Sequence, residues 1–281
     1  MPALTLLCPA KVNLRLEVLG RRDDGYHNIF SIMQRISLCD RLTLSARPGG
    51  IELTVTGVDL PADEGNIVYR AARLFLAEAG LTSGVSMSLV KRIPMAAGLG
   101  GGSSDAAATL VGLNHLFGAQ VPTCRLMELA RSLGADVPFF IFRGPAVAEG
   151  IGERLSEIKG LPRLSYVLVN IGRRISTAWA YEKLNLKLTK DQNDFIVDHI
   201  RDGSFNIFNM LKNDFEDVVF PEYPEVEAVK QRLLASGARG ALMSGSGSTV
   251  FGLFLDRVKA ERAFQSLTPE FGSGVWLARG V

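Results

Sequence analysis

A glycine-rich stretch, residues 94–104, holds the residue types and spacing best suited to chemistry. It reads PMAAGLGGGSS, with four glycines at Gly98, Gly100, Gly101 and Gly102. Without Cβ atoms, the main chain can approach a ligand closely and point several N–H groups at it. Alternating residues before the stretch predict a strand, and alanine-rich residues after it predict a helix. Because a helix N-terminus attracts anions, this loop predicts a polyphosphate site.

Three other interpretations of a glycine-rich loop have to be compared with that one. A Walker loop requires Gly-Lys, and the chain contains no such pair. A dinucleotide fingerprint requires an acid about 20 residues further on, where this chain has none. A plain turn before a helix capped by Ser103 or Ser104 stays open. Asp105 is an unfavourable neighbour for phosphate, and we interpret it as a first-turn acid that the helix dipole favours.

Two charged residues outside the loop are candidates for proton chemistry. Asp136 follows a predicted helix in the segment GADVP, where a carboxylate can accept a proton from a hydroxyl. The ordinary alternative is an aspartate that forms a turn beside Pro138. Lys11 lies among apolar residues of a predicted strand, and such a lysine is usually exposed at a strand edge.

An aromatic pair and a second small-residue loop are candidates for binding. Tyr26 and His27 follow Gly25 in a polar segment, where a core role is hard to justify. Tyr26 could stack on a pyrimidine while His27 contacts its polar edge, although a loop histidine is often merely solvated. The loop at residues 245–248, GSGS, either shapes a phosphate site or is a plain hairpin turn.

Composition excludes several classes of protein. The 281 residues carry a formal net charge of only +2, which argues against bulk binding to nucleic acid or to an acidic membrane. No apolar run approaches the thickness of a bilayer, and the first residues do not resemble a secretion signal. The cysteines Cys8, Cys39 and Cys124 show no metal-ligand spacing. We therefore expect reduced thiols in a cytoplasmic protein.

The order of predicted elements indicates an α+β fold rather than a doubly wound parallel sheet. Pro48-Gly49-Gly50 predicts a hairpin between strands at 41–47 and 51–57. Asn66 predicts the N-cap of a helix that ends at Gly80. A domain boundary is expected near residues 150–165. The remaining expected strands are 4–19, 85–89, 166–171 (central), 241–244, 249–255 and 275–278, and the remaining expected helices begin near 103, 122, 177 and 226.

Three separated segments resemble the motifs of the GHMP kinases. They are PAKVNL at residues 9–14, the loop at residues 98–104, and GSG at residues 245–247. The finer match includes GYH at residues 25–27 and GADVPFF at residues 134–140. These segments are similar to the members that act on a cytidine diphosphate-linked methylerythritol. The resemblance covers nearly the whole chain in order and is weakest over residues 185–225.

The resemblance implies a two-domain fold with the active site in the cleft between the domains. The N-terminal half, residues 1–155, would be ribosomal-protein-like, and the C-terminal half, residues 156–281, would be ferredoxin-like. ATP and Mg²⁺ are the implied cofactors, and the implied partner is the CDP-linked methylerythritol, which the enzyme would phosphorylate on a hydroxyl. No nucleic acid or membrane partner is expected.

The resemblance also implies roles for individual residues. Lys11 and Asp136 would be catalytic, with Lys11 keeping the carboxylate ionised. Tyr181 would be the second aromatic against the base, with Trp179 as its rival. Nucleotide contacts are implied for Asn66, Pro94, Met95, Ala96, Ala97, Gly98, Leu99, Gly100, Gly101, Gly102, Ser103 and Ser104. Acceptor contacts are implied for Asn13, Tyr26, His27, Tyr181, Gly245 and Ser246.

Two rival functions remain at this stage. One is a GHMP kinase for another small alcohol, such as homoserine or mevalonate, and only cytidine dependence separates it from the favoured function. The other is a non-catalytic nucleotide-binding or RNA-binding module, which the nearly neutral charge disfavours.

Overall fold

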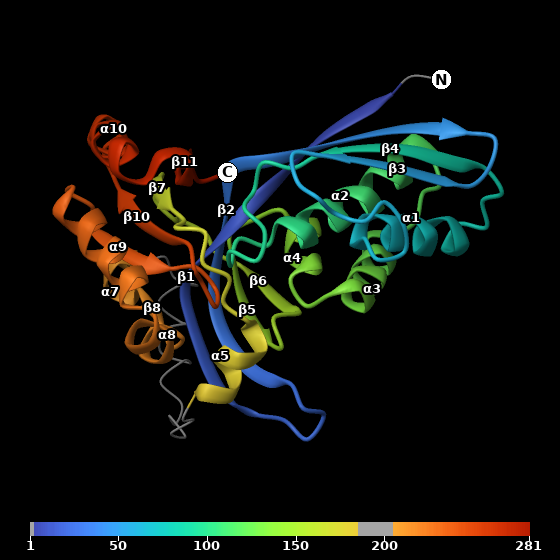
Figure 1. Cartoon of the computed structure of the whole chain (residues 1–281). Coiled ribbons are helices and arrows are strands. Elements are labelled where there is room, and N and C mark those ends of the chain that lie inside the picture. Colours follow the sequence, from blue (N-terminus) through green and yellow to red (C-terminus); the bar gives the residue numbers. More distant parts are fainter. Residues whose placement is uncertain (1–2, 185–204) are drawn as a thin grey trace. The chain divides into compact units, whose positions relative to one another are not determined.

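The structure, a computed structural model, describes residues 3–184 and 205–281 and divides into two compact units (Figure 1). The first unit contains Met1–Ala10, Cys39–Met95 and Gly100–Arg143. The second unit contains Lys11–Leu38, Ala96–Leu99 and Gly144–Val281. The units are therefore interleaved along the chain. The domain limits expected from the sequence, 1–155 and 156–281, stay a prediction.

Two long strands contribute to both units. Strand β1 spans Leu4–Arg21, and strand β2 spans His27–Arg47. The turn between them is closed by two main-chain hydrogen bonds: Arg22 N–H donates to the Tyr26 carbonyl at 2.8 Å, and Gly25 N–H donates to the Arg22 carbonyl at 3.1 Å. His27 is thus the first residue of a strand rather than part of the polar loop.

In the first unit, strand β4 (Gly84–Val90) lies between β2 and β3 (Ile51–Thr56). It pairs antiparallel with the last part of β2 and parallel with β3. The expected hairpin of residues 41–47 with 51–57 is therefore wrong. The turn at residues 48–50 passes around the end of β4, where a Cβ on Gly84 would overlap the Gly50 carbonyl. The glycines mark a crossover between strands that are not neighbours.

Four helices complete the first unit, and they lie together on one side of β3 and β4 (Figure 1). Asn66 caps α1 as expected, because its Oδ1 accepts from the Val68 N–H at 3.0 Å. Helix α2 begins at Gly101 with Gly100 as N-cap, so the alternative in which Ser103 or Ser104 caps it is wrong. The helices are α1 (Ile67–Glu78), α2 (Gly101–Leu116), α3 (Thr123–Leu133) and α4 (Val137–Phe142).

Helix α2 packs closely on the sheet of the first unit. A Cβ on Gly112 would come within 2.5 Å of Leu44 and 2.8 Å of Leu6. Leu110 and Leu113 of the same helix are fully buried. Because protein interiors are close-packed, this contact fixes the helix, and with it the N-terminus that follows the glycine-rich loop.

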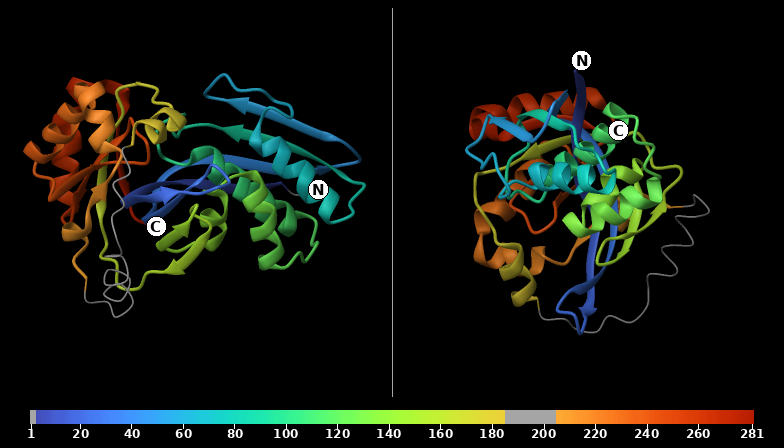
Figure 2. Two further views of the ribbon diagram at one scale, coloured as in Figure 1. Left: turned by 90° about the horizontal axis from the view of Figure 1, so that it is seen from below. Right: turned by 90° about the vertical axis from the view of Figure 1, so that its right-hand side faces the viewer.

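The second unit contains a four-stranded sheet in the order β11-β7-β10-β9. Strand β7 is central, as expected, and it pairs antiparallel with both neighbours; β9 and β10 form the expected hairpin. Helices α9 and α10 cover one face of this sheet (Figure 2). The bounds are β7 (Ser165–Val169), β9 (Gly240–Met243), β10 (Val250–Phe254), β11 (Val275–Arg279), α9 (Pro224–Ala235) and α10 (Arg257–Phe271).

Short strands and helices complete the second unit. Strand β5 pairs antiparallel with the first part of β2 and with β6, and β8 pairs parallel with β1. The mixture of these elements confirms the α+β class. None of the helices within residues 3–184 and 205–281 is long and apolar enough to span a membrane. The bounds are β5 (Ala146–Gly150), β6 (Arg154–Glu157), β8 (Lys212–Asn213), α5 (Thr177–Lys183), α7 (Ile207–Met210), α8 (Glu216–Glu222) and the 3-10 turn Gly272–Gly274.

Candidate functional site

The main chain of the glycine-rich loop adopts conformations that favour glycine. Gly98 has a φ of 75° and Gly100 a φ of 67°, and Ala96 adopts a φ of 50° between them and the strand. A Cβ on Gly98 would overlap the carbonyl of Ser244. At least one glycine of the run is therefore required by packing inside the protein, whether or not a ligand binds.

Residues 96–99 are held by the strand that carries Lys11 and by the loop after β9. The Lys11 N–H donates to the Leu99 carbonyl at 2.9 Å. The Ser244 hydroxyl donates to the Gly98 carbonyl, also at 2.9 Å. A Cβ on Gly245 would lie only 3.2 Å from the Gly98 Cα. The structure thus brings together parts of all three segments that carried the family resemblance.

The N-terminus of α2 is open to an anion. Its N-cap, Gly100, has no side chain to accept from the first-turn N–H groups, which lack acceptors within the helix. Gly102 is exposed, and a Cβ there would meet nothing closer than Ile67 at 3.7 Å. Ser104 is 1% exposed, and its hydroxyl has no hydrogen-bond partner among the described residues. A phosphate oxygen would satisfy these donors.

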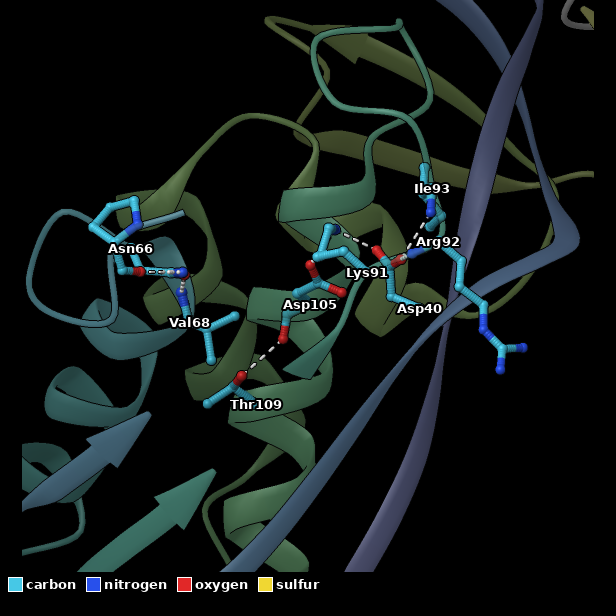
Figure 3. A network of polar contacts seen from close by, with 9 residues as sticks. Asp40, Asn66, Val68, Lys91, Arg92, Ile93, Asp105 and Thr109 are labelled. Carbon is cyan, nitrogen blue, oxygen red and sulfur yellow. Dashed lines mark hydrogen bonds and ion pairs between the residues drawn. The ribbon is translucent and has the colours of Figure 1, made fainter. Parts of the chain in front are cut away.

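A cluster of three charged residues lies beneath this helix terminus (Figure 3). Lys91 Nζ lies 2.7 Å from Asp105 Oδ2 and also forms an ion pair with Asp40. Burial raises the pKa of Asp105 to about 7, and the Lys91 ammonium opposes that shift. Asp105 therefore points into the protein, and the helix dipole alone does not explain it. Sequence reasoning missed Asp40 and Lys91.

Lys11 is buried, so the ordinary alternative of a lysine exposed at a strand edge is wrong. It is 4% exposed, and its Nζ donates to Asn13 Oδ1 at 2.6 Å. Asn13 Nδ2 in turn donates to the Ser31 hydroxyl at 2.8 Å, and Ser31 donates to the Arg15 carbonyl at 2.7 Å. A chain of hydrogen bonds thus sets the orientation of the lysine and the asparagine. Ser31 is a supporting residue that sequence reasoning missed.

Asp136 lies at the N-terminus of α4 in the first unit. Its backbone is helical, with φ −83° and ψ −12°, and its side chain makes no capping hydrogen bond. It is only partly buried. The role of Asp136 beside Lys11 stays a prediction.

Three of the aromatic candidates lie in the second unit with well-defined neighbours. His27 stacks on Tyr181 with ring centroids 4.6 Å apart and an interplanar angle of 15°. Trp179 instead packs edge-on against Tyr223 at 5.7 Å. Burial and nearby Arg21 lower the pKa of His27, so that its imidazole is neutral at pH 7. The geometry favours Tyr181 over Trp179 as the partner of His27.

Asn66 and Ser246 are already engaged with the protein. The Asn66 amide donates to the Pro61 carbonyl at 2.9 Å while its oxygen caps α1. The Ser246 and Thr177 hydroxyls lie 2.8 Å apart. The N-cap role of Asn66 is therefore established, and its adenine contact stays a prediction.

Asn213 is another supporting residue that sequence reasoning missed. Its Nδ2 donates to the carbonyls of Met243 and Gly245, at 2.7 and 2.8 Å. Its Oδ1 accepts from the Phe215 N–H at 3.0 Å. This one side chain fixes the start of the loop that packs against Gly98. A buried asparagine in a two-residue strand gives no distinctive sequence signal.

The described part of the chain offers no cluster of side chains for a metal ion. Within residues 3–184 and 205–281, no group of three or more histidine, cysteine, aspartate or glutamate side chains could hold an ion. Mg²⁺ commonly keeps several waters and binds through nucleotide phosphates. A protein cage for Mg²⁺ does not fit these residues, and we assign the ion no step.

Two family models match this chain. The model described as GHMP kinases N terminal domain matches residues 66–144, and the model described as GHMP kinases C terminal matches residues 201–274. Together they cover more than half of the sequence. The chain belongs to the GHMP kinase family. The expectation of a small-molecule kinase is thereby confirmed. An open helix terminus after a glycine-rich loop suits the phosphoryl-transfer chemistry of this family.

Full-length relatives give the same result for this GHMP kinase. The chain is 47% identical over 278 residues to 4-diphosphocytidyl-2-C-methyl-D-erythritol kinase of Syntrophotalea carbinolica, covering 99% of this chain and 98% of the relative. It is 47% identical to the enzyme of the same name from Geobacter sulfurreducens, with 95% of each chain covered. The similarity extends through both halves of the chain.

Solved structures confirm the two-domain GHMP kinase fold. A crystal structure of 4-(cytidine 5'-diphospho)-2C-methyl-D-erythritol kinase matches with a TM-score of 0.84 and 39% identity, covering 99% of each chain. Homoserine kinase from Cytophaga hutchinsonii matches with a TM-score of 0.77 at 19% identity, covering 100% of this chain and 95% of that one. The second match shows the fold alone.

Proposed function

We propose that this GHMP kinase transfers the terminal phosphoryl group of ATP to a hydroxyl of 4-diphosphocytidyl-2-C-methyl-D-erythritol, in the cytoplasm. The relatives with that name are nearly half identical to the chain over almost its whole length. One observation within the site carries the proposal. The Lys11 main-chain N–H donates a hydrogen bond to the Leu99 carbonyl in the glycine-rich loop, while the buried Lys11 ammonium group donates to Asn13.

The nucleotide would bind at the glycine-rich loop. The first-turn N–H groups of α2 and the Ser104 hydroxyl would donate to phosphate oxygens. Gly102 is exposed at this helix terminus, and a side chain there would occupy space that the phosphates need. Since phosphoryl transfer depends mainly on positioning and charge stabilisation, a loop fixed before binding suits this chemistry.

The acceptor hydroxyl would attack the terminal phosphorus in line with the departing ADP. As the new P–O bond forms and the bond to ADP breaks, the hydroxyl proton would pass to Asp136. The Lys11 ammonium would favour the ionised carboxylate and polarise the hydroxyl. Asn13 would orient the acceptor through its amide. The pairing of Lys11 with Asp136 is part of the proposal.

The cytosine of the acceptor would bind against aromatic rings. Tyr26 is 58% exposed, so its ring is accessible to a base. His27 is neutral and close to Tyr181, so it can donate to or accept from a base edge. Ser246 and Gly245 would contact the phosphate-bearing part of the acceptor. These contacts would distinguish a cytidine conjugate from a simple alcohol.

A substrate panel tests the proposal. The purified protein is incubated with ATP, Mg²⁺ and one alcohol: the cytidine conjugate, the same alcohol phosphate without cytidine, homoserine or mevalonate. We expect ADP formation with the cytidine conjugate only. Turnover of homoserine or mevalonate at a comparable kcat/KM would instead assign the protein to another branch of the GHMP kinases. ATP hydrolysis without any acceptor serves as the blank.

A further inference from the structure

The buried charges of Asp40, Lys91 and Asp105 have no part in the proposed transfer. Asp40 is 0% exposed, Lys91 7% and Asp105 1%. Burying three charges is unfavourable unless they are paired with good geometry. Such a cluster beside a ligand loop therefore calls for a function (Figure 3).

The cluster joins both ends of the glycine-rich loop. Asp40 Oδ1 accepts from the N–H groups of Arg92 and Ile93, the latter at 2.8 Å, and these residues directly precede the loop. Lys91 then bridges Asp40 to Asp105 in the second turn of α2, just after the loop ends. The Lys91 side chain thus connects the two ends of the glycine-rich loop through Asp40 and Asp105.

The lysine also lies directly beneath the first residue of α2. A Cβ on Gly101 would come within 3.3 Å of the Lys91 ammonium and 3.1 Å of Ile93. The Lys91 ammonium therefore lies close to the main chain at the helix terminus. The thiol of Cys8 lies against Asp105 on another side, and its pKa is raised mainly by burial, so that it stays neutral.

The net charge of the cluster argues against direct electrostatic attraction of phosphate. Two carboxylates and one ammonium carry at most zero net charge when Asp105 is protonated, and −1 when it is ionised. An anion site would gain nothing from such charges alone. Their value lies in the geometry that they impose on the backbone.

We propose that Asp40, Lys91 and Asp105 form a positioning clamp that sets the separation of the two ends of the glycine-rich loop for nucleotide binding. Lys91 is a positioning residue that acts through the main chain of Arg92, Ile93 and Gly101. The inference rests on the proposed function only in taking the loop as the nucleotide site, and it is independent of which alcohol is phosphorylated.

A matched pair of variants at Asp105 separates geometry from charge. Asp105→Asn removes the charge but keeps an oxygen that can accept from Lys91, whereas Asp105→Ala removes both the charge and the bridge. Lys91 remains paired with Asp40 in each variant, so both are expected to fold. ADP affinity is measured by titration calorimetry, and the KM for ATP and for the acceptor are measured separately.

The clamp predicts that the KM for ATP changes while the KM for the acceptor does not. Asp105→Ala should weaken ADP binding at least tenfold and raise the KM for ATP, with the acceptor KM within twofold of the unsubstituted protein. Asp105→Asn should bind ADP within twofold of normal. Equal effects of the two variants, of whatever size, overturn the clamp, as does a change confined to Asp105→Asn. A matching rise in the acceptor KM would also overturn it, because a general loss of structure would then explain the result.

Two controls keep this test separate from the proposed function. Arg232→Met removes an exposed ion pair with Glu270 and should leave ADP affinity unchanged. If the unsubstituted protein fails to bind ADP, the nucleotide site itself is wrong and the proposed function fails with it. If it binds ADP but the Asp105 variants do not differ, only the clamp fails.

Discussion

The glycine-rich loop is held by polar contacts and close backbone packing, whereas His27 and Tyr181 in the second unit are held by contacts between aromatic rings. Around the loop, buried ion pairs, main-chain hydrogen bonds and glycines without room for a Cβ fix the backbone. Around His27 and Tyr181, rings contact rings: His27 stacks on Tyr181, Tyr181 packs edge-on against Phe215, and Tyr26 is largely exposed. Ring pairs contribute about 0.5–1.5 kcal/mol beyond their burial.

Under the proposed function, the nucleotide and the acceptor would therefore be bound in different ways. The backbone of the glycine-rich loop is fixed by internal contacts, so if ATP binds there as proposed, little ordering is left for it to induce. The rings of His27 and Tyr181 already contact one another, so a base that binds there as proposed would have to add to the stack or displace one ring. We therefore expect substitutions near the loop to alter stability as well as nucleotide binding, and substitutions at the rings to alter acceptor binding alone.

The first prediction concerns Asp136, the proposed general base. Asp136→Asn should lower kcat by about 10²–10⁴-fold, because general-base catalysis contributes that much. Both KM values should remain close to normal. Steady-state kinetics with each substrate varied in turn gives the answer. A kcat within tenfold of the original would remove Asp136 from the proton transfer.

The second prediction tests whether the loop is fixed by internal packing. Gly98→Ala should lower the free energy of unfolding by about 2–4 kcal/mol, since the new Cβ overlaps the Ser244 carbonyl and the positive φ disfavours alanine. Gly102→Ala has space around it, so it should change stability little and weaken ADP binding instead. Urea unfolding and calorimetry measure the two quantities. Equal stability losses would show that the glycines do not differ in role.

The third prediction concerns the rings. Tyr181→Ala should raise the acceptor KM about tenfold or more, because base stacking is worth about 1–3 kcal/mol per base. Trp179→Ala is the matched control, since Trp179 packs on Tyr223 rather than on His27. Its acceptor KM should stay within about twofold. The reverse ranking would identify Trp179 as the base contact.

The fourth prediction is a pH dependence of stability. Burial raises the pKa of Asp105 from 3.8 to about 7, so the native state holds this proton more tightly than the unfolded state does. Its contribution to stability is therefore full below about pH 4 and is lost as pH rises towards 7, by at most about 1.4 kcal/mol per pH unit. Asp105→Asn should flatten the fall in Tm between pH 5 and 7. An unchanged slope would show that Asp105 is ionised throughout.

Local patterns predicted the elements well, and contacts between distant residues limited the rest. The cap at Asn66, the central strand β7 and the hairpin of β9 with β10 follow from neighbouring residues and are confirmed. The hairpin expected at residues 48–50 was wrong, because strand order depends on β4, more than 30 residues further along. Turn residues predict where a chain bends, but they do not predict which strands pair on either side of the bend.

The same limit applies to the candidate site. The glycine spacing indicated an anion site, but the need for glycine at position 98 comes from Ser244, 146 residues away. Lys11 had the sequence features of an exposed residue, and only the family resemblance assigned it a catalytic role. Asp40 and Lys91 gave no signal because their pairing joins the end of one strand to the middle of another. The role of Asp136 still depends on the resemblance.

The interleaving of the two units along β1 and β2 decides how the protein can be divided. A fragment ending at Arg143 would contain the whole first unit together with Lys11–Leu38, whose strand partners β5 and β8 come later in the chain. Those unpaired edges would invite association between copies of the fragment. Ribosomal synthesis meets the same situation, since the second unit cannot close until its last strand has left the ribosome.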